Sequence, residues 1–484
     1  MSLKIYNTFT GKKEDFVPVV PGHVKMYVCG VTVYDRCHMG HARAGVVFDF
    51  VYRSLKFLGF ETTYVRNFTD VDDKIIKRAS ERGITCDELV DENIKAFYED
   101  MDSLFLKRPD HEPRATRYIA QMQDIIKTLL AKGLAYEAGG DVYFAVEKFP
   151  EYGNLSKRHL DEMEAGARVA VNEGKNNPLD FALWKAAKPG EPKWPSPWGE
   201  GRPGWHIECS AMGRDLLGEE FDIHGGGKDL VFPHHENEIA QSQGACGKPP
   251  ARYWMHNGFV NINKEKMSKS LGNFFTIREV TQKFDPEVVR LYLLSTHYRS
   301  PIDFADEYLR EAQGTLDYLY RALHRAEILP GFDYNFDPNK ADEISDNILE
   351  KLKGALEDDF NSATAVALLH ETAKKLNLAV SSVKHNSVGI SYVSVAGYYS
   401  ALRRIGDVLG LFNYEREGYF KRITVFHLRE IGISEYEIQT LVDRRDSARK
   451  LKNFIEADAI RDKLLNKRIE IEDTQFGTKW WVHR

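Results

Sequence analysis

A strand that leads directly into a helix, with two histidines at the junction, restricts the fold of this chain more than any other stretch. Residues 24–29 and 31–34 are apolar and β-branched enough for a buried strand that Gly30 interrupts, and a helical pattern runs from near His41 to Leu58. The junction is the tetrad His38-Met-Gly-His41. Amide N–H groups and the helix dipole favour phosphate there, and two imidazoles can donate to phosphoryl oxygens. The alternative is that both histidines only cap the helix.

Length, charge and cysteine content limit the class of protein. A chain of 484 residues is too long for one ordinary core, so we expect two to four domains. The net charge of -6 does not indicate a nucleic-acid partner overall, so any polyanion must bind local basic surface. Five scattered cysteines indicate reduced thiols and a cytoplasmic protein. No secretion signal and no apolar run of about 18 residues is present, which argues against a membrane partner.

The pattern continues as an open parallel sheet with one interruption. A second strand over residues 62–68 completes a βαβ unit, and the dense Pro, Gly and Trp content after residue 188 indicates an irregular insertion. Thr69-Asp-Val-Asp-Asp73 follows the second strand, where open α/β sheets place ligands. An acidic helix cap explains these residues equally well. The α/β pattern resumes at Gly204.

A metal-binding set can be assembled from three distant segments. His234 and Glu238 are four residues apart in a helical pattern that begins at Pro233, so they share one helix face. With Cys29 and Cys209 they make a four-coordinate set suited to zinc. Sequence spacing does not bring the two cysteines together, and a buried strand thiol beside a polar helix face is the alternative.

The glycine run Gly225-Gly-Gly-Lys228 matches neither common phosphate-binding fingerprint. It lies between His224 and Asp229, so it suits close backbone approach to a ligand such as adenosine. A flexible turn is the equal alternative.

A basic, hydroxyl-rich loop follows over residues 264–273. Lys266 and Lys269 are compact cations able to reach a triphosphate, and Ser268 and Ser270 can donate hydrogen bonds to it. Isolated loops of this kind are usually only solvated. Here the loop and the tetrad occur together, in order, on either side of an α/β pattern.

This pair of motifs resembles the class I aminoacyl-tRNA synthetases. Four stretches closely resemble the cysteinyl-tRNA synthetase family, and the likeness extends along essentially the whole chain; they are residues 26–30, 202–212, 232–238 and 264–273. The tetrad departs from the family only at Met39, where Ile or Leu is usual. An apolar exchange there packs equivalently.

The resemblance implies a cysteine–tRNA ligase that is a cytoplasmic monomer. Such an enzyme activates L-cysteine with ATP and Mg²⁺ to cysteinyl-adenylate, then transfers cysteine to the 3′-terminal adenosine of tRNA(Cys). One zinc ion per chain, held by Cys29, Cys209, His234 and Glu238, would take the substrate thiol. Shape alone excludes serine by only about 1–3 kcal/mol, whereas zinc strongly favours thiolate over hydroxyl.

The resemblance also implies the remaining site residues. Those implied for catalysis are His38, His41, Lys266 and Lys269. Those implied for ATP binding are His38, Gly40, His41, His224, Gly226, Asp229, Lys266, Ser268 and Lys269. Thr69 and Trp205 are implied to contact the amino acid substrate.

The expected fold is α/β, with a Rossmann-like parallel-sheet catalytic domain followed by a helical bundle and a small anticodon-binding domain. The catalytic domain would comprise residues 1–134 and 205–260, interrupted by a connective insertion. The remaining units are the insertion 135–204, a signature-loop and stem-contact region 261–313, the bundle 314–424 and the C-terminal domain 425–484. In the last, a basic helix over 444–464 and the tryptophans Trp480 and Trp481 suit phosphate contacts and base stacking.

Three other functions remain open at this level. A sister ligase that transfers cysteine to an amino sugar would explain residues 1–310, although the long C-terminal extension argues against it. A nucleotidylyltransferase would share the tetrad but would leave the zinc set unexplained. A non-catalytic zinc-dependent RNA-binding protein would catalyse no pyrophosphate exchange.

Overall fold

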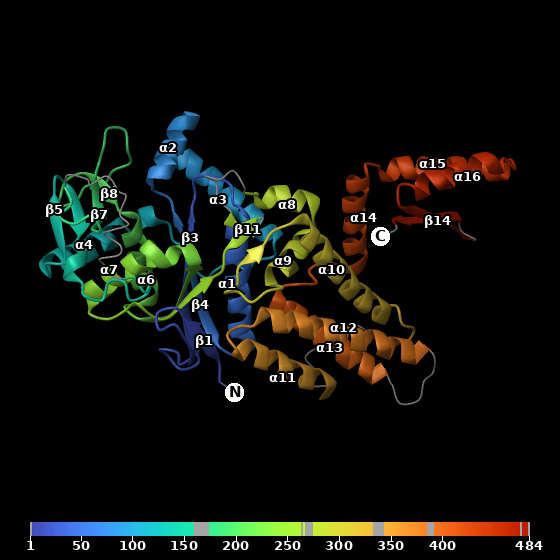
Figure 1. Cartoon of the computed structure of the whole chain (residues 1–484), viewed down its shortest axis with the longest axis horizontal. Helices are drawn as coiled ribbons and strands as arrows, with labels where there is room; N and C mark the ends of the chain where they lie inside the picture. The colour runs from blue at the N-terminus through green and yellow to red at the C-terminus, as the bar shows by residue number, and fades with distance from the viewer. Residues whose placement is uncertain are drawn as a thin grey trace.

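A computed structural model of the chain describes residues 2–158, 174–262, 265–266, 274–332, 343–384, 392–474 and 477–482. Figure 1 shows a long molecule in which an antiparallel sheet, a central parallel sheet, a helical bundle and a small C-terminal unit follow one another. Among the described residues, no helix combines the length and apolar character that crossing a membrane requires.

The central sheet has four parallel strands in the order β10-β9-β3-β4. Their bounds are β3 (His23–Thr32), β4 (Glu61–Thr69), β9 (Phe221–Gly227) and β10 (Ala251–Asn257). The chain passes from β3 to β4 on one side and later adds β9 on the other side. The strand order therefore reverses at β3, and open α/β sheets bind ligands outside the carboxyl ends of the strands at this point. The expected α/β class is confirmed.

Helices cover both faces of this sheet. Side chains of β3 alternate between them, so Met26 packs in the core that includes α1 (Met39–Phe57), whereas Tyr27 packs in the core that includes α6 (Trp205–Leu217) and α7 (Glu236–Cys246). After β4 the chain forms α2 (Asp73–Arg82) and α3 (Cys86–Ser103). Asp72 caps α2 by accepting a hydrogen bond from the Lys74 amide at 2.9 Å, so this acid does serve as a helix cap.

A separate antiparallel sheet lies beside the central one. Its strand order is β5-β6-β7-β8, with α4 (Ile119–Ala131) packed between it and the helices of the central domain. The strands are β5 (Ala135–Ala138), β6 (Asp141–Phe144), β7 (Phe181–Ala186) and β8 (Gly201–Pro203). The buried Trp184 holds Trp198 edge-on at 5.9 Å, which anchors the Pro- and Gly-rich loop.

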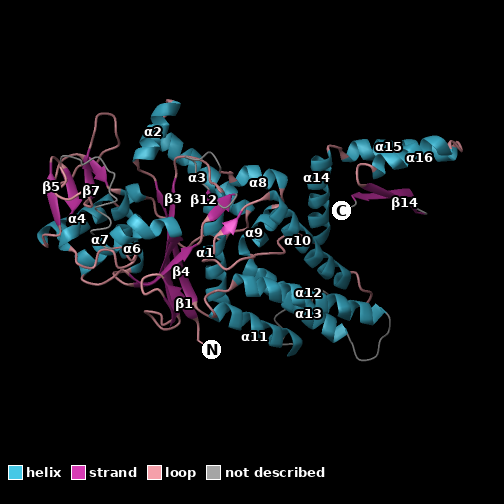
Figure 2. Ribbon diagram, viewed as in Figure 1, coloured by secondary structure: helices cyan, strands magenta, loops and turns pink. Residues whose placement is uncertain are grey.

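Beyond β10 the chain becomes mainly helical, as Figure 2 shows. A small sheet of β11 (Val260–Ile262), β12 (Glu265–Lys266) and β13 (Ile302–Asp303) precedes and flanks α8 (Ile277–Lys283) and α9 (Pro286–Leu294). The helical bundle comprises α10 (Asp306–Glu327), α11 (Glu343–Glu357), α12 (Ser362–Lys384) and α13 (Tyr392–Leu409). The N-terminal hairpin of β1 (Lys4–Asn7) and β2 (Lys12–Asp15) reaches this bundle through the Asp359 amide, which donates to the Lys4 carbonyl at 2.9 Å.

The C-terminal unit has a small core of its own. It follows α14 (Arg416–Ile431) and contains α15 (Glu435–Lys450), α16 (Phe454–Leu465), β14 (Ile469–Thr474) and β15 (Gly477–Val482). The expected single basic helix is wrong: α15 ends at Lys450 and the chain turns through Lys452, whose φ is 59°. Trp480 packs against this core, and the side chain of Trp481 lies outside the described residues.

A buried ion pair joins the central parallel-sheet domain to the bundle. Arg290 of α9 pairs with Asp49 of α1 and donates to the carbonyls of Leu409 at 2.6 Å and Leu104 at 3.1 Å. Arg53 also donates to Asp49, at 2.7 Å. Four segments therefore meet at one carboxylate and one guanidinium that are almost wholly buried.

We predict that Arg290→Gln destabilises the protein by about 3–5 kcal/mol. The buried Asp49 carboxylate would lose its buried cationic partner, and the Leu409 and Leu104 carbonyls would lose their hydrogen-bond donor. The matched control is Arg310→Gln, which breaks the exposed 3.4 Å pair with Glu430 and should cost about 0–1 kcal/mol. Thermal unfolding followed by circular dichroism measures both. Equal midpoints for the two variants would contradict the role assigned to the joint.

Candidate active site and metal centre

A cavity of about 490 Å³ opens at the carboxyl edge of the parallel sheet, where the strand order reverses. Its wall includes Cys29 and Thr32 of β3, the start of α1, and Gly227 at the end of β9. This volume lies in the range of small-molecule sites. The fold therefore places a ligand-sized hollow where a parallel sheet is expected to bind one.

The histidine tetrad forms one wall of this cavity and also starts α1. His38 Nδ1 accepts a hydrogen bond from the Gly40 amide at 3.1 Å, and His41 Nδ1 accepts one from the His38 amide at 3.3 Å. The rings stack with centroids 3.8 Å apart. Because each Nδ1 is an acceptor, each neutral ring carries its proton on Nε2. The histidines do cap the helix, and this capping selects the tautomer that can donate from Nε2.

The residues that follow the basic loop are hydrogen-bonded beside the tetrad. After the loop, the Phe275 carbonyl accepts from the Met39 amide at 3.1 Å and the Ile277 amide donates to the Cys37 carbonyl at 3.0 Å. Before it, Lys266 pairs with Asn261 in the β11–β12 ladder. Ser268 and Lys269 lie outside the described residues, as does the side chain of Lys266.

Two cysteines, a histidine and a glutamate meet behind the cavity. Cys29 Sγ lies 3.6 Å from Cys209 Sγ of α6 and 3.4 Å from Glu238 Oε1 of α7. His234 Nε2 lies 3.6 Å from Cys209 Sγ and 3.0 Å from Glu238 Oε1. The structure thus brings together all four residues expected to bind zinc.

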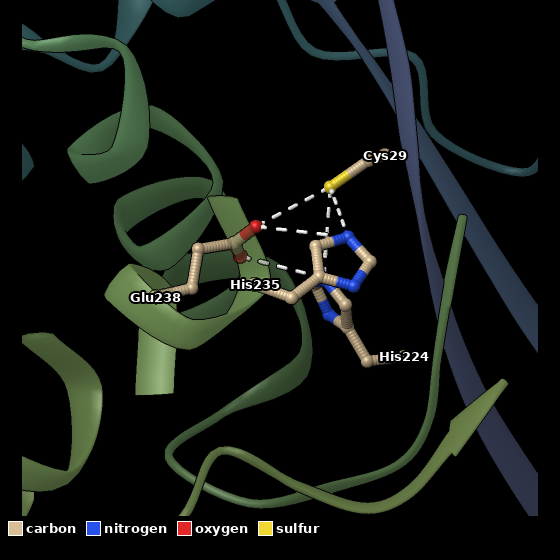
Figure 3. Close-up of side chains that lie close together, drawn as sticks. All are labelled: Cys29, His224, His235 and Glu238. Atoms are coloured by element: carbon tan, nitrogen blue, oxygen red, sulfur yellow. Dashed lines mark hydrogen bonds and ion pairs between the residues drawn. The ribbon is translucent and has the colours of Figure 1, made fainter. Parts of the chain in front are cut away.

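Two further imidazoles join the same cluster, and Figure 3 shows both beside Cys29 and Glu238. His235 Nε2 is 3.3 Å and His224 Nε2 3.6 Å from Cys29 Sγ, and His224 Nε2 is 3.4 Å from Glu238 Oε2. Two overlapping sets result, each with its ligand atoms within 4.8 Å of one another. We call them the thiol quartet, Cys29, Cys209, His234 and Glu238, and the imidazole quartet, Cys29, His224, His235 and Glu238.

Burial and close contact shift the acidity of the cluster. The hydrogen bond from Cys29 lowers the pKa of the Cys209 thiol to about 6, although burial opposes this. Burial acts to lower the pKa of His234, but the charges of Glu238 and Cys209 outweigh it and raise it to about 10. His224 and His234 hold the pKa of Glu238 well below its usual range against the effect of burial. Cys209 and Glu238 are therefore the anionic groups of this buried site, since burial raises the pKa of the Cys29 thiol well above its usual range.

A second layer of side chains orients the rings. His206 Nδ1 lies 2.9 Å from His234 Nδ1, and Trp205 stacks on His234 with centroids 4.1 Å apart. His256 Nε2 lies 2.9 Å from His235 Nδ1. Partners on the outer nitrogen fix ring orientation in metal sites, so both rings have their Nε2 atoms directed toward the cluster.

The other expected site residues fall into two groups. Gly40, Trp205 and Asp229 line the cavity. His224 instead lies in the imidazole quartet, and the Thr69 hydroxyl donates to the buried Glu208 carboxylate at 2.7 Å.

Gly226 belongs to β9 and not to a flexible turn. A Cβ atom there would lie 2.9 Å from the His235 ring, which explains the glycine by packing.

Sequence reasoning missed three residues around the cluster. His235 carried a usable signal, since it lies three residues before Glu238 and on a neighbouring part of the same helical face. His206 and His256 carried none, because only the fold brings them near His234 and His235.

Comparison with known proteins agrees with this geometry. Residues 15–314 match the family described as tRNA synthetases class I (C) catalytic domain, and residues 351–413 match the DALR domain. The chain is 54% identical over 481 residues to the cysteine–tRNA ligase of Syntrophotalea carbinolica, covering 99% of each. It is 53% identical over 492 residues to that of Geobacter metallireducens, covering 100% of each.

Solved structures show the same fold at low identity. Mycobacterium tuberculosis methionyl-tRNA synthetase in complex with methionyl-adenylate has a TM-score of 0.57 at 14% identity, covering 86% of this chain and 94% of that one. A putative arginyl-tRNA synthetase from Campylobacter jejuni has a TM-score of 0.55 at 13% identity, covering 80% and 93%. From the catalytic-domain match and the full-length identities together, the chain belongs to the class I aminoacyl-tRNA synthetases, within the cysteine–tRNA ligase family.

Proposed function

We propose that this chain activates L-cysteine with ATP and transfers it to the 3′-terminal adenosine of tRNA(Cys). The observation that carries the proposal is the position of Cys29, which lines the nucleotide-sized cavity and also belongs to both quartets. A thiol-selective centre is thereby open to the cavity that the histidine tetrad also lines. One bound molecule can place its sulfur at Cys29 and its reacting group near His38.

The thiol quartet fits zinc. Zinc–ligand bonds of about 2.0–2.3 Å put the atoms of a tetrahedral site about 3.3–3.8 Å apart. Four of the six contacts among Cys29, Cys209, His234 and Glu238 are 3.0–3.6 Å, and all four ligand atoms lie within 4.8 Å of one another. Bound zinc would supply a Lewis acid that prefers a substrate thiolate to a hydroxyl.

Two features favour the thiol quartet over the imidazole quartet. It offers a second sulfur, and soft thiolate ligands select zinc. His234 has His206 at its outer nitrogen, whereas His224 Nδ1 is buried with no hydrogen-bond partner among the described residues. Metal-bound histidines almost always donate from the outer nitrogen.

In the first step, the cysteine carboxylate attacks the α-phosphorus of ATP in line. A new P–O bond forms while the bond to pyrophosphate breaks, so charge grows on the phosphoryl oxygens. His38 and His41 donate from Nε2 to these oxygens, and amide groups at the start of α1 add further donors. We assign Lys266 and Lys269 to the departing phosphates, with Mg²⁺ accompanying the nucleotide.

In the second step, the 2′-hydroxyl of the terminal adenosine attacks the activated carbonyl and releases AMP. The helical hairpin of α15 and α16, at the far end of the molecule from the cavity, supplies the surface for the anticodon (Figure 1). The presence of this unit favours tRNA charging over the amino-sugar ligase alternative. The tetrad and the cavity favour a catalytic function over a non-catalytic RNA-binding one.

Cysteine-dependent ATP–pyrophosphate exchange, followed by charging of tRNA(Cys), tests the proposal. We expect exchange with cysteine, little with serine, and charging of tRNA. Exchange without charging would favour the amino-sugar ligase. No exchange in zinc-replete protein would favour the RNA-binding alternative.

The capping role of His38 can be separated from its phosphate role by His38→Asn. Asparagine is a good helix cap and can accept from the Gly40 amide, but it lacks the Nε2 donor. We predict an unchanged thermal midpoint and an exchange kcat lower by about 10²–10³-fold. His38→Ala should lose exchange and also about 1 kcal/mol of stability. If His38→Asn keeps full pyrophosphate exchange, His38 serves only as a helix cap.

Zinc content distinguishes the two quartets. We predict that Cys209→Ser and His234→Gln lose zinc, whereas His224→Gln and His235→Gln retain about one ion per chain, because only the first pair belongs to the thiol quartet. Cys86→Ser, on α3, is the matched thiol control. Inductively coupled plasma mass spectrometry of purified proteins gives the stoichiometry. The reverse pattern would assign the metal to the imidazole quartet.

Removal of residues 433–484 tests the division of labour between the two ends of the chain. This cut leaves α14 whole, including Tyr419, which donates to Asp317 of α10 at 2.7 Å. We predict pyrophosphate exchange within about 2-fold of the full chain and charging at least about 10-fold weaker, as expected when stacked or phosphate contacts to RNA are lost. Equal loss of both activities would contradict the separation.

A further inference from the structure

A second cavity, of about 460 Å³, lies where the catalytic half meets the bundle. Three segments line it: the end of α1, the strip from residue 107 to 108, and the last turns of α13. Lys56 stands fifteen residues after His41, which is about 22 Å along α1. The cavity is therefore separate from the active site.

The lining is strongly basic. It contains five cations and one carboxylate, in a chain whose net charge is -6. Two of the cations are held in place by other groups. Arg53 donates to Asp49 at 2.7 Å and to the Phe105 carbonyl at 2.9 Å, and Arg108 donates to Asp102 at 2.6 Å.

The other three cations have no ion pair within the part of the chain that the structure describes. They are Lys56, Lys107 and Arg404, each from a different lining segment. The Lys56 ammonium lies 4.4 Å from the centroid of the Tyr52 ring. Like charges gathered round one hollow repel one another, and a bound anion would relieve that repulsion.

We propose that this cavity binds an oligophosphate group, either free or carried by a nucleotide. Lysines act as point charges toward phosphate and arginine as a two-pronged donor, so the three segments can contact several phosphoryl groups at once. Tyr52 is buried beneath the Lys56 ammonium, so the half-buried Phe57 is the aromatic side chain that can receive a base. A concave site built from three segments suits a compact anion better than an extended RNA backbone, which favours a basic stripe.

Isothermal titration calorimetry of the full chain tests this, with the active site saturated by a non-hydrolysable cysteinyl-adenylate analogue. The probes are sodium tripolyphosphate and GTP. We expect binding that weakens with salt, and at least a 10-fold weaker affinity in Lys107→Gln/Arg404→Gln. The matched control, Lys351→Gln/Lys374→Gln, changes the charge equally on exposed bundle positions and should bind like the parent. Lys107→Arg/Arg404→Lys should restore binding.

The outcomes separate the sources of phosphate. Tighter binding of GTP than of tripolyphosphate supports a nucleotide ligand, and equal affinity supports the oligophosphate alone. No binding of either probe, or equal binding in the neutralised variant, overturns the proposal. If the parent does not bind tripolyphosphate and the neutralised variant binds tRNA more weakly, the surface belongs to an RNA site. That result also overturns the proposal. Unchanged thermal midpoints and pyrophosphate exchange confirm that each variant is folded.

Discussion

The contact between Cys29 and Cys209, at 3.6 Å, is the interaction on which the active centre depends. It joins β3 to α6, and Glu238 brings α7 to the same point. Burying thiols, imidazoles and a carboxylate together opposes folding, because each charged form loses hydration. The apolar core shared by Tyr27, Ile207 and Ile239 must therefore hold these elements in register. Packing therefore stabilises an arrangement that the loss of hydration opposes.

Helix α1 links this centre to the rest of the molecule. It begins at the tetrad that borders the active cavity, and Asp49, near its middle, pairs with Arg290 of α9. The position of the bundle and the position of His38 are thus set through one helix. Gly410 lets the chain pass close to the buried Asp49–Arg290 ion pair. Its φ of +69° disfavours other residues, and a Cβ atom would stand 2.3 Å from the Arg290 guanidinium. A side chain there would push the joint apart.

Local pattern predicted what depends on near neighbours in the chain. The strand-to-helix junction at the tetrad and the shared position of His234 and Glu238 follow from periodicities of two and of 3.6 residues. The meeting of Cys29 with Cys209 does not, because 180 residues separate them and only the fold brings them together. Composition also gave no sign that the partly buried Trp480 ring packs against a small core, because only the folded C-terminal unit creates that core.

The tetrad shows how one group can serve both folding and chemistry. The Nδ1 atom of each ring accepts a hydrogen bond from a backbone amide, at 3.1 and 3.3 Å, and the ring centroids lie 3.8 Å apart. A ring held by both its cap and its neighbour loses little further freedom when it meets phosphate, and donors fixed in advance stabilise developing charge most effectively. The cap that begins α1 is thereby also the reason that the Nε2 donors need no reorganisation. The structural and catalytic roles of His38 and His41 are therefore linked, because capping the helix produces the ring geometry that phosphate stabilisation requires.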